Sequence, residues 1–178
     1  MNLDSPKRRD AAFAPGFPLA YLITFTTYGT RLHGDDRGSV NTNNNLHQTP
    51  YLNENRQINQ WQRQLLRAEP LILSTPHRKI VHRMIENAAR HNGWDIRALN
   101  VRTNHVHVVI AGDATPEFIM NSLKSKSTRG LKEHGIIREN GTYWTRHGST
   151  EYLWTAQEVG AACHYVIERQ GEDLQCEV

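Results

Sequence analysis

Two histidines and one tyrosine are the candidate reactive residues of this chain. His105 and His107 are separated by a single valine in the apolar run HVHVVIAG (105–112). Because alternate residues of a strand point to the same face, the two imidazoles would project together. Two neutral imidazoles placed in this way can ligate one divalent cation. Two histidines on a solvated sheet face are the alternative, but the apolar flanks favour a central strand.

A metal site built on this pair would need at least one oxygen ligand from elsewhere in the chain. Mg²⁺ and Mn²⁺ prefer about six ligands, which are mostly oxygen atoms. A third protein ligand is therefore expected, with water or phosphate in the remaining positions. The last predicted helix offers Glu158, Glu168 and Gln170.

Tyr165 lies in the middle of that same predicted helix, in the segment CHYVIERQ (163–170). A phenol can attack a phosphodiester when a metal ion polarises the phosphoryl group and eases loss of the phenol proton. The product is a phosphotyrosine ester, which keeps the bond energy for later rejoining. A core tyrosine whose hydroxyl is bonded to a neighbour is the alternative interpretation.

Length and composition limit the classes of protein to which the chain can belong. Its 178 residues suit one compact domain with surface insertions, and 38% of them are hydrophobic. No apolar run is long enough to span a membrane, and the first residues lack the apolar segment of a secretory signal. Because Cys163 and Cys176 are the only cysteines, a cytoplasmic location is expected. The formal charge of +3 permits an anionic partner without requiring one.

The hydrophobic periodicity predicts strands and helices that would position these residues. Thr75 is the expected N-cap of a helix that continues with Pro76 and ends at Gly93, and Thr155 with Glu158 fits a capping box. The order favours an α+β sandwich with helices against one antiparallel sheet. The expected strands lie within 19–32, 94–101, 105–112 and, as a short extended piece, 142–146; the expected helices lie within 58–69, 75–93, 116–133 and 155–171.

Four segments, in this order along the chain, resemble the IS200-like single-tyrosine transposases of the His-hydrophobic-His class, which include the REP-associated tyrosine transposases. The segments are YLITFTTYGTRLHGD, GWDIRALNVRTNHVHVVI, SLKSKSTRGLK and YWTRHGSTEYLWTAQEVGAACHYVIERQG. The resemblance covers residues 19–171. It implies a ferredoxin-like βαββαβ sandwich with an antiparallel sheet and an added C-terminal helix that carries the tyrosine.

The resemblance also implies an enzyme that cuts single-stranded DNA beside a folded hairpin and rejoins it. Tyr165 would be the nucleophile, forming a 5′-phosphotyrosine and leaving a free 3′-hydroxyl. His105 and His107 would hold a divalent metal ion, Mg²⁺ or Mn²⁺. A polar residue near the end of the tyrosine helix would be the third ligand, for which we assign Gln170, with Glu168 as the alternative. Family members often place this residue four positions after the tyrosine, whereas Gln170 is five positions after Tyr165 and points about 140° away on an ideal helix.

The implied organisation is a flexible basic tail at 1–18, a single transposase domain at 19–171 with a long insertion at 33–70, and a C-terminal tail at 172–178. The segment HGDDRGSV (33–40) of the insertion would either contact DNA or pack on the sheet. The sequence leaves open whether the site is completed within one chain or by a helix from the partner in a homodimer. A membrane partner is not expected.

Basic and aromatic residues supply the candidate DNA contacts, because cations neutralise phosphates and aromatic rings stack on unpaired bases. A solvated helix face is the alternative for the cations, which share no narrow stripe, and burial is the alternative for the aromatic rings. The cations are Lys124, Lys126, Arg129 and Lys132, and the aromatic residues are Tyr143, Trp144, Tyr152 and Trp154.

Two other functions compete with strand cleavage and rejoining. A catalytically inactive or domesticated protein could bind DNA hairpins and act by occupancy. A metallohydrolase could use the histidine pair, although barrel enzymes with such a pair need a longer chain and more ligands.

Overall fold

The computed structural model describes residues 17–32, 55–139 and 141–168. Most of the predicted N-terminal tail, the insertion segment 33–54, Gln170 and the C-terminal tail lie outside the described residues. Within the described part, no helix combines the length and the apolar character needed to cross a membrane.

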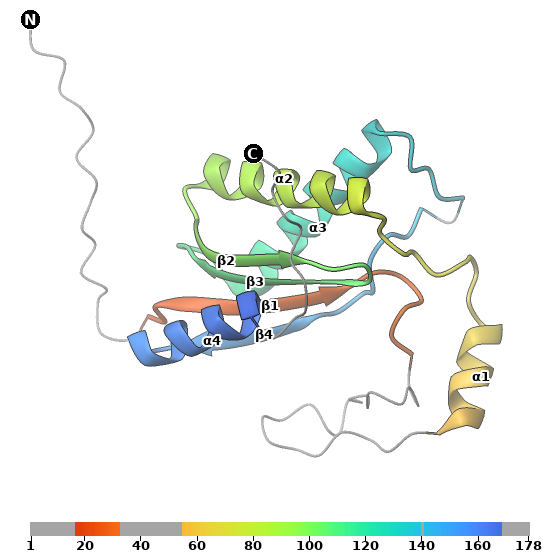
Figure 1. The fold of residues 1–178 in the computed structure, drawn as a ribbon, viewed down its shortest axis with the longest axis horizontal. Coiled ribbons are helices and arrows are strands. Elements are labelled where there is room, and N and C mark those ends of the chain that lie inside the picture. Colours follow the sequence, from red (N-terminus) through yellow and green to blue (C-terminus); the bar gives the residue numbers. More distant parts are fainter. Residues whose placement is uncertain (1–16, 33–54, 140, 169–178) are drawn as a thin grey trace, which may run out of the picture.

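The described chain forms one four-stranded sheet with helices on both of its faces (Figure 1). Strands lie in the order β2-β3-β1-β4, and each strand is antiparallel to its neighbours. Without α1 and α4 this is the βαββαβ order of a ferredoxin-like sandwich, so the expected α+β fold is confirmed. The elements are β1 (Ala20–Thr26), α1 (Arg56–Gln64), α2 (Thr75–Asn92), β2 (Asp95–Val101), β3 (His105–Ala111), α3 (Pro116–Glu133), β4 (Ser149–Leu153) and α4 (Ala156–Glu168).

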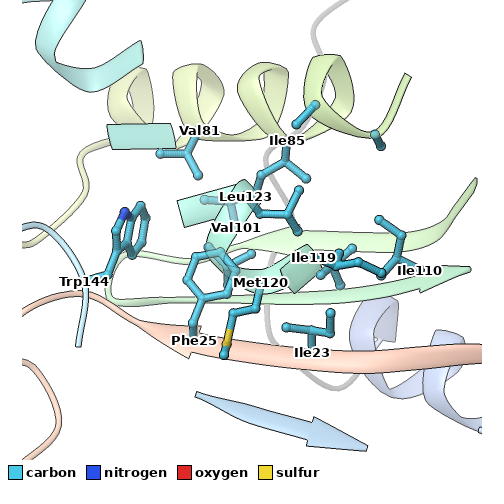
Figure 2. Packing of buried hydrophobic residues seen from close by; sticks show 14 of the residues in the cluster. Ile23, Phe25, Val81, Ile85, Val101, Ile110, Ile119, Met120, Leu123 and Trp144 are labelled. Atoms are coloured by element: carbon cyan, nitrogen blue, oxygen red, sulfur yellow. The ribbon is translucent and has the colours of Figure 1, made fainter. Parts of the chain in front are cut away.

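The large apolar core lies between the sheet and the helices α2 and α3. Figure 2 shows side chains of α2 and α3 pointing toward the strands, where they meet Ile23 and Phe25 of β1. Burial of these side chains supplies most of the hydrophobic free energy of this layer. The helices contribute Val81, Ile85, Ile119, Met120 and Leu123, and the strands add Val101, Val106, Val108 and Ile110.

A smaller apolar cluster holds α4 against the opposite face of the sheet. Ala162 and Val166, four residues apart on α4, are its buried helical members. Most of the other members have small side chains, which lets the helix lie close to the strands. They are Ala20, Ala98, Val109, Ala111 and Leu153.

A bulge in β2 decides which of its residues face α4. Ile96 pairs with Ile110 and Ala98 pairs with Val109, so Arg97 is the extra residue. A bulge of this kind changes the alternation of faces along a strand. Ile96 therefore packs on the large core, whereas Ala98 belongs to the cluster beneath α4.

Three element boundaries differ from the sequence predictions. Thr75 is not the N-cap of α2, because the cap position with extended backbone is Ser74, although Gly93 does end the helix in the left-handed conformation. The helix of the insertion covers Arg56–Gln64 rather than 58–69, because the side chain of Asn55 caps it by accepting from Ile58 N.

The last strand was predicted at 142–146 and lies instead at Ser149–Leu153. The predicted segment makes a single isolated bridge, between Trp144 and Thr27, the residue that follows β1. Trp144 is drawn toward α3, where its ring nitrogen donates to Lys124 O at 3.1 Å and to Thr128 Oγ1 at 3.0 Å. With the Trp144 side chain held against α3, the segment 142–146 does not pair along β1 as a continuous strand.

Candidate active site

The two histidines lie side by side at the start of β3, on the face of the sheet that α4 covers. Their ring centroids are 4.7 Å apart. Val106 and Val108 point to the other face and are fully buried in the large core. His107 is only 7% exposed, so the alternative of a solvated pair is wrong for this residue. Because β3 lies between β2 and β1, the expected central strand is confirmed.

A hydrogen bond to Nδ1 holds each imidazole in place. Thr24, the residue opposite His107 on β1, has its Oγ1 2.7 Å from His107 Nδ1. Asn104 Oδ1 lies 2.7 Å from His105 Nδ1. Neighbouring polar groups of this kind orient an imidazole for metal binding through its other nitrogen. The donor set therefore fits the pair of nitrogen ligands that a divalent cation would require.

Tyr165 on α4 lies directly beside the histidine pair. Its ring centroid is 5.6 Å from that of His107, and the two ring planes are 77° apart. The side chain is 40% exposed, so Tyr165 is not a core tyrosine and solvent reaches it. Residues 58 positions apart in the sequence thus share one site at the surface of the sheet.

The position of α4 depends on a buried amide of β2. Asn100 is opposite His107 in the sheet register, and its Nδ2 donates to Val166 O at 3.0 Å. Carbonyl groups in the last turn of a helix have no partner within the helix, so a donor from the sheet stabilises that end. The carbonyl that is bonded belongs to the residue after Tyr165. This bond helps to fix the tyrosine beside the imidazoles.

The start of α4 carries the predicted capping box. Thr155 Oγ1 accepts from Glu158 N at 3.2 Å, and Glu158 Oε2 accepts from Thr155 N at 3.0 Å and from Trp154 N at 2.6 Å. These backbone bonds lower the pKa of the Glu158 carboxyl. Since Glu158 caps the helix about two turns before Tyr165, it does not reach the histidine pair.

The third metal ligand, which is expected to be an oxygen donor, is not identified among the described residues. Glu168 is exposed and forms an ion pair with His164, with 3.1 Å between Glu168 Oε2 and His164 Nδ1. Gln170 lies outside the described residues. No group of three or more His, Cys, Asp and Glu side chains in the described stretches is arranged to hold a metal ion. The choice between Gln170 and Glu168 stays a prediction.

Lys124 was a candidate DNA contact, yet the structure places it inside the molecule. It is 7% exposed, and its Nζ donates to Thr145 O at 3.0 Å and His147 O at 3.2 Å. The ammonium group also lies 5.6 Å from the centroid of the Phe25 ring. Burial lowers the pKa of Lys124 to about 8. These contacts hold the segment before β4 against α3 and do not favour a phosphate contact.

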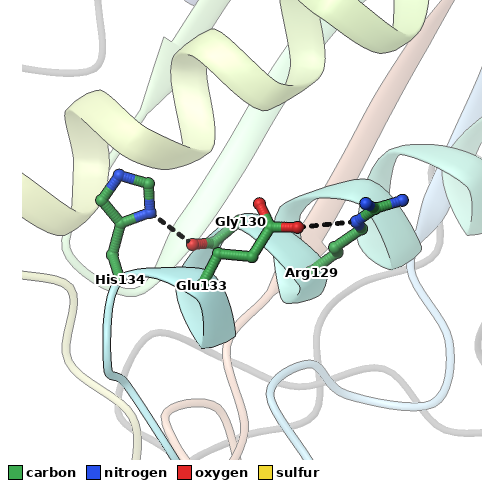
Figure 3. Close-up of polar contacts among 4 residues, drawn as sticks. All are labelled: Arg129, Gly130, Glu133 and His134. Atoms are coloured by element: carbon green, nitrogen blue, oxygen red, sulfur yellow. Dashed lines mark hydrogen bonds and ion pairs between the residues drawn. The ribbon is translucent and has the colours of Figure 1, made fainter.

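The other three cations of α3 lie across the sheet from the histidine pair. Lys126 and Arg129 border a hollow of about 220 Å³ between α2 and α3, which His91 also lines. Figure 3 shows Arg129 turned toward Glu133, with 2.7 Å between Arg129 Nε and Glu133 Oε1. The Lys132 ammonium lies 5.8 Å from the Tyr143 ring centroid. The structure therefore does not bring these cations to the site of Tyr165.

The four aromatic residues divide into two pairs. Tyr143 and Trp144 are buried in the large core. Tyr152 and Trp154 are exposed and stacked, with ring centroids 6.0 Å apart and planes 15° apart. The surface therefore offers one of the two pairs to a base.

The sequence predictions missed three polar residues that surround the site: Thr24, Asn100 and Asn104. Asn100 and Asn104 stand in the same run as the histidines, and Thr24 is a polar residue at an alternating position of the first strand. A polar side chain at a predicted strand position was the feature that could have identified them.

Comparisons with known proteins give one family and two related structures. The family model described as "Transposase IS200 like" matches residues 67–169. A REP-associated tyrosine transposase bound to a REP hairpin is 12% identical, aligned over 84% of this chain and 65% of its own length, with a TM-score of 0.46. This chain thus spans just under two thirds of that protein. A Deinococcus radiodurans protein assigned as a transposase is 14% identical, aligned over 92% of this chain and 98% of its own, with a TM-score of 0.49. No curated protein matches the chain.

Proposed function

The chain belongs to the family of IS200-like transposases, and we propose that it cleaves and rejoins single-stranded DNA beside hairpins through a 5′-phosphotyrosine intermediate. The observation that carries this proposal is the position of Tyr165, whose exposed ring lies 5.6 Å from the ring of His107. A nucleophile and a pair of metal-binding groups are useful to one reaction only when they share a site.

In the proposed reaction the phenolic oxygen of Tyr165 forms a bond to phosphorus, and the bond from phosphorus to the 3′ oxygen breaks. The phenol proton is lost to water, and the departing 3′ oxygen takes up a proton to leave a free 3′-hydroxyl. The 5′ end stays on the protein as a phosphotyrosine ester. Attack by a 3′-hydroxyl on that ester reverses the step and restores both the phosphodiester and the phenol.

The residues around Tyr165 have separate tasks in this proposal. His105 and His107 would hold the divalent ion, with Gln170 or Glu168 as the third ligand. When bound, an Mg²⁺ or Mn²⁺ ion would polarise the phosphoryl group. Asn100 holds the end of α4, which keeps the phenol beside the imidazoles.

A covalent adduct with DNA is the direct test of this function. The protein is incubated with hairpin-bearing single-stranded DNA and Mn²⁺, and the products are separated on a denaturing gel. We expect a covalent protein–DNA adduct that Tyr165→Phe abolishes while DNA binding survives, since phenylalanine lacks the attacking oxygen. Tyr21→Phe is the matched control, because it removes a phenolic hydroxyl from a tyrosine that is buried in the large core, on the opposite face of the sheet from the histidine pair.

The metal assignment has its own test in the same assay. His105→Ala and His107→Ala should each remove metal-dependent cleavage, whereas His82→Ala, on α2, should retain it. Normal cleavage by both variants would refute the metal site. Two other outcomes would identify the competing functions. A gel-shifted DNA complex without an adduct, unchanged by Tyr165→Phe, would identify a DNA-hairpin-binding protein without catalysis. Release of product from small substrates without any adduct would identify a hydrolase.

The proposal also covers the domain organisation, the oligomeric state and the DNA contacts away from the cleavage site. The 19–171 segment would act as a single transposase domain, either alone or as a homodimer in which a partner supplies part of the site. Lys126, Arg129 and Lys132 would contact phosphates outside the cleavage site, so affinity for DNA should fall with salt and fall less steeply in their alanine variants.

A further inference from the structure

The side chain of Asn104 contacts the ring of His105 at one of its two nitrogens. Its Oδ1 lies 2.7 Å from His105 Nδ1. An amide oxygen can only accept a hydrogen bond, so the ring nitrogen must donate. A neutral imidazole has a single N–H, and when Nδ1 carries it the ligating lone pair is on Nε2.

The backbone of Asn104 is anchored independently of its side chain. Its carbonyl oxygen accepts from Thr27 N at 2.8 Å, from Thr27 Oγ1 at 3.1 Å and from Thr30 Oγ1 at 3.2 Å. Thr27, the residue directly after β1, is fully buried. The turn between β2 and β3 is thus tied to the segment after β1 through a main-chain carbonyl that any residue at position 104 would possess.

The contact between neighbouring side chains has a local structural cause. Adjacent residues within a strand point to opposite faces and do not meet. Asn104 precedes the first residue of β3 and lies in a bend, which lets its amide turn toward His105. The geometry is therefore specific to this position, and the side-chain bond can be removed without removing the anchor of the turn.

We infer that Asn104 is a positioning residue, which holds His105 with Nδ1 protonated so that Nε2 faces a divalent cation. The inference rests on the proposed function, because the cation belongs to the site that we assign to the histidine pair. Outer partners of metal-binding histidines generally act in this way, and their loss weakens metal affinity by roughly 10- to 100-fold.

The tautomer of His105 can be observed in the unmodified protein without metal. Two-dimensional spectra that correlate the imidazole carbon-bound protons with the ring nitrogens distinguish a protonated Nδ1 from a protonated Nε2. We expect His105 in the wild-type protein to carry its proton on Nδ1. A proton on Nε2 would overturn the inference, since Asn104 would then be donating its amide to the ring.

The second readout is the affinity for Mn²⁺. It is measured from the electron paramagnetic resonance signal of free Mn²⁺ as the ion is titrated into the protein. Asn104→Leu removes the acceptor and should weaken Mn²⁺ binding by roughly 10- to 100-fold. Asn104→Asp keeps an acceptor and should bind Mn²⁺ at least as well as the wild type. The matched control is Asn121→Leu, an exposed asparagine on α3, which should leave the affinity unchanged.

These outcomes separate the inference from the proposed function. If His105→Ala lowers Mn²⁺ affinity but Asn104→Leu does not, the metal site stands and the role of Asn104 is refuted. Weak binding by Asn104→Asp would also refute it, because a carboxylate can only accept from Nδ1. If His105→Ala itself leaves Mn²⁺ affinity unchanged, the proposed metal site fails, and the wild-type spectrum still tests separately whether His105 carries its proton on Nδ1.

Discussion

The two faces of the sheet are built from the same strands and serve different purposes. On β1, Ile23 and Phe25 enter the large core, whereas Thr24 between them bonds to His107 on the opposite face. On β3, Val106 and Val108 enter the core while His105 and His107 form the candidate site. The period of two along each strand separates packing from chemistry within a few residues.

The helices that cover these faces differ in how firmly they are held. Eight residues of α3 are buried, and they span most of its length. In α4 only Ala162 and Val166 are buried, and an amide from β2 adds one bond at its end. Segments with few buried contacts open at lower free energy than the core. We therefore expect α4, which carries the candidate nucleophile, to open at lower free energy than α3.

Neighbouring residues on opposite faces provide the largest expected contrast. Phe25→Ala should lower the free energy of unfolding by about 3–5 kcal/mol, because it leaves a cavity in the large core. Thr24→Ala should lower it by only about 1 kcal/mol, the typical value for one hydrogen bond. Urea unfolding of both variants measures the difference. Equal losses in the free energy of unfolding would contradict the conclusion that one face of the sheet supplies packing and the other the candidate site.

Removing the anchor of α4 should have an intermediate effect. Asn100→Ala deletes the donor to Val166 O, and the loss of one buried hydrogen bond should cost about 1–3 kcal/mol. Amide exchange in the last turns of α4 should accelerate more than exchange in α3, since only α4 loses a contact. Uniform acceleration in both helices would mean that α4 is not an independently opening element.

The capping box at the start of α4 should contribute less. Thr155→Ala removes the oxygen that accepts from Glu158 N, and loss of such a cap typically costs about 1 kcal/mol. The decrease should appear in the urea midpoint, together with faster exchange in the first turn of α4. Thr115→Ala is the matched variant at the start of α3, where Thr115 Oγ1 accepts from Phe118 N. If Thr115→Ala accelerates exchange in α3 more than Thr155→Ala accelerates it in α4, then α4 is not the less firmly held helix.

The last expected effect is a dependence of stability on pH, which belongs to the core face. Burial lowers the pKa of Lys124 from 10.5 to about 8, so between these values the unfolded chain binds a proton that the folded chain lacks. The penalty of burying the ammonium is complete below about pH 8 and declines as the pH rises toward 10.5. The stability of the wild type relative to Lys124→Met should therefore rise across this interval in chemical unfolding. A flat or falling difference would show that the ammonium stays charged in the folded protein.

Local patterns were sufficient to predict much of the fold. The alternation in HVHVVIAG predicted both the strand and the shared face of the histidines, because side-chain direction in a strand follows from backbone geometry alone. Pro116 at a helix start and Gly93 at a helix end predicted α3 and the end of α2, since both residues act through their own backbone preferences. The N-cap of α2 was wrong by one residue, because Ser74 and Thr75 are chemically equivalent as caps.

Contacts between distant segments were beyond local patterns. The fourth strand was misplaced because Tyr143 and Trp144 look like strand residues, whereas they leave the sheet edge to fill the core beside α3. Lys124 looked like a surface cation on its helix. Its ammonium instead donates to two carbonyl groups of a loop about twenty residues away in the sequence, and hydrophobic periodicity does not predict such a contact.

The types of the reactive groups, the common direction of the two imidazoles and the helix that carries Tyr165 could all be read from the amino-acid sequence, since each depends on one element alone. The approach of Tyr165 to His107 could not, because it arises from packing between elements. That approach depends on the bulge at Arg97, which turns Asn100 toward α4, and on the small side chains that let α4 lie close to the sheet. Both are consequences of packing between elements, where the position of each residue is set by neighbours that are remote in the sequence.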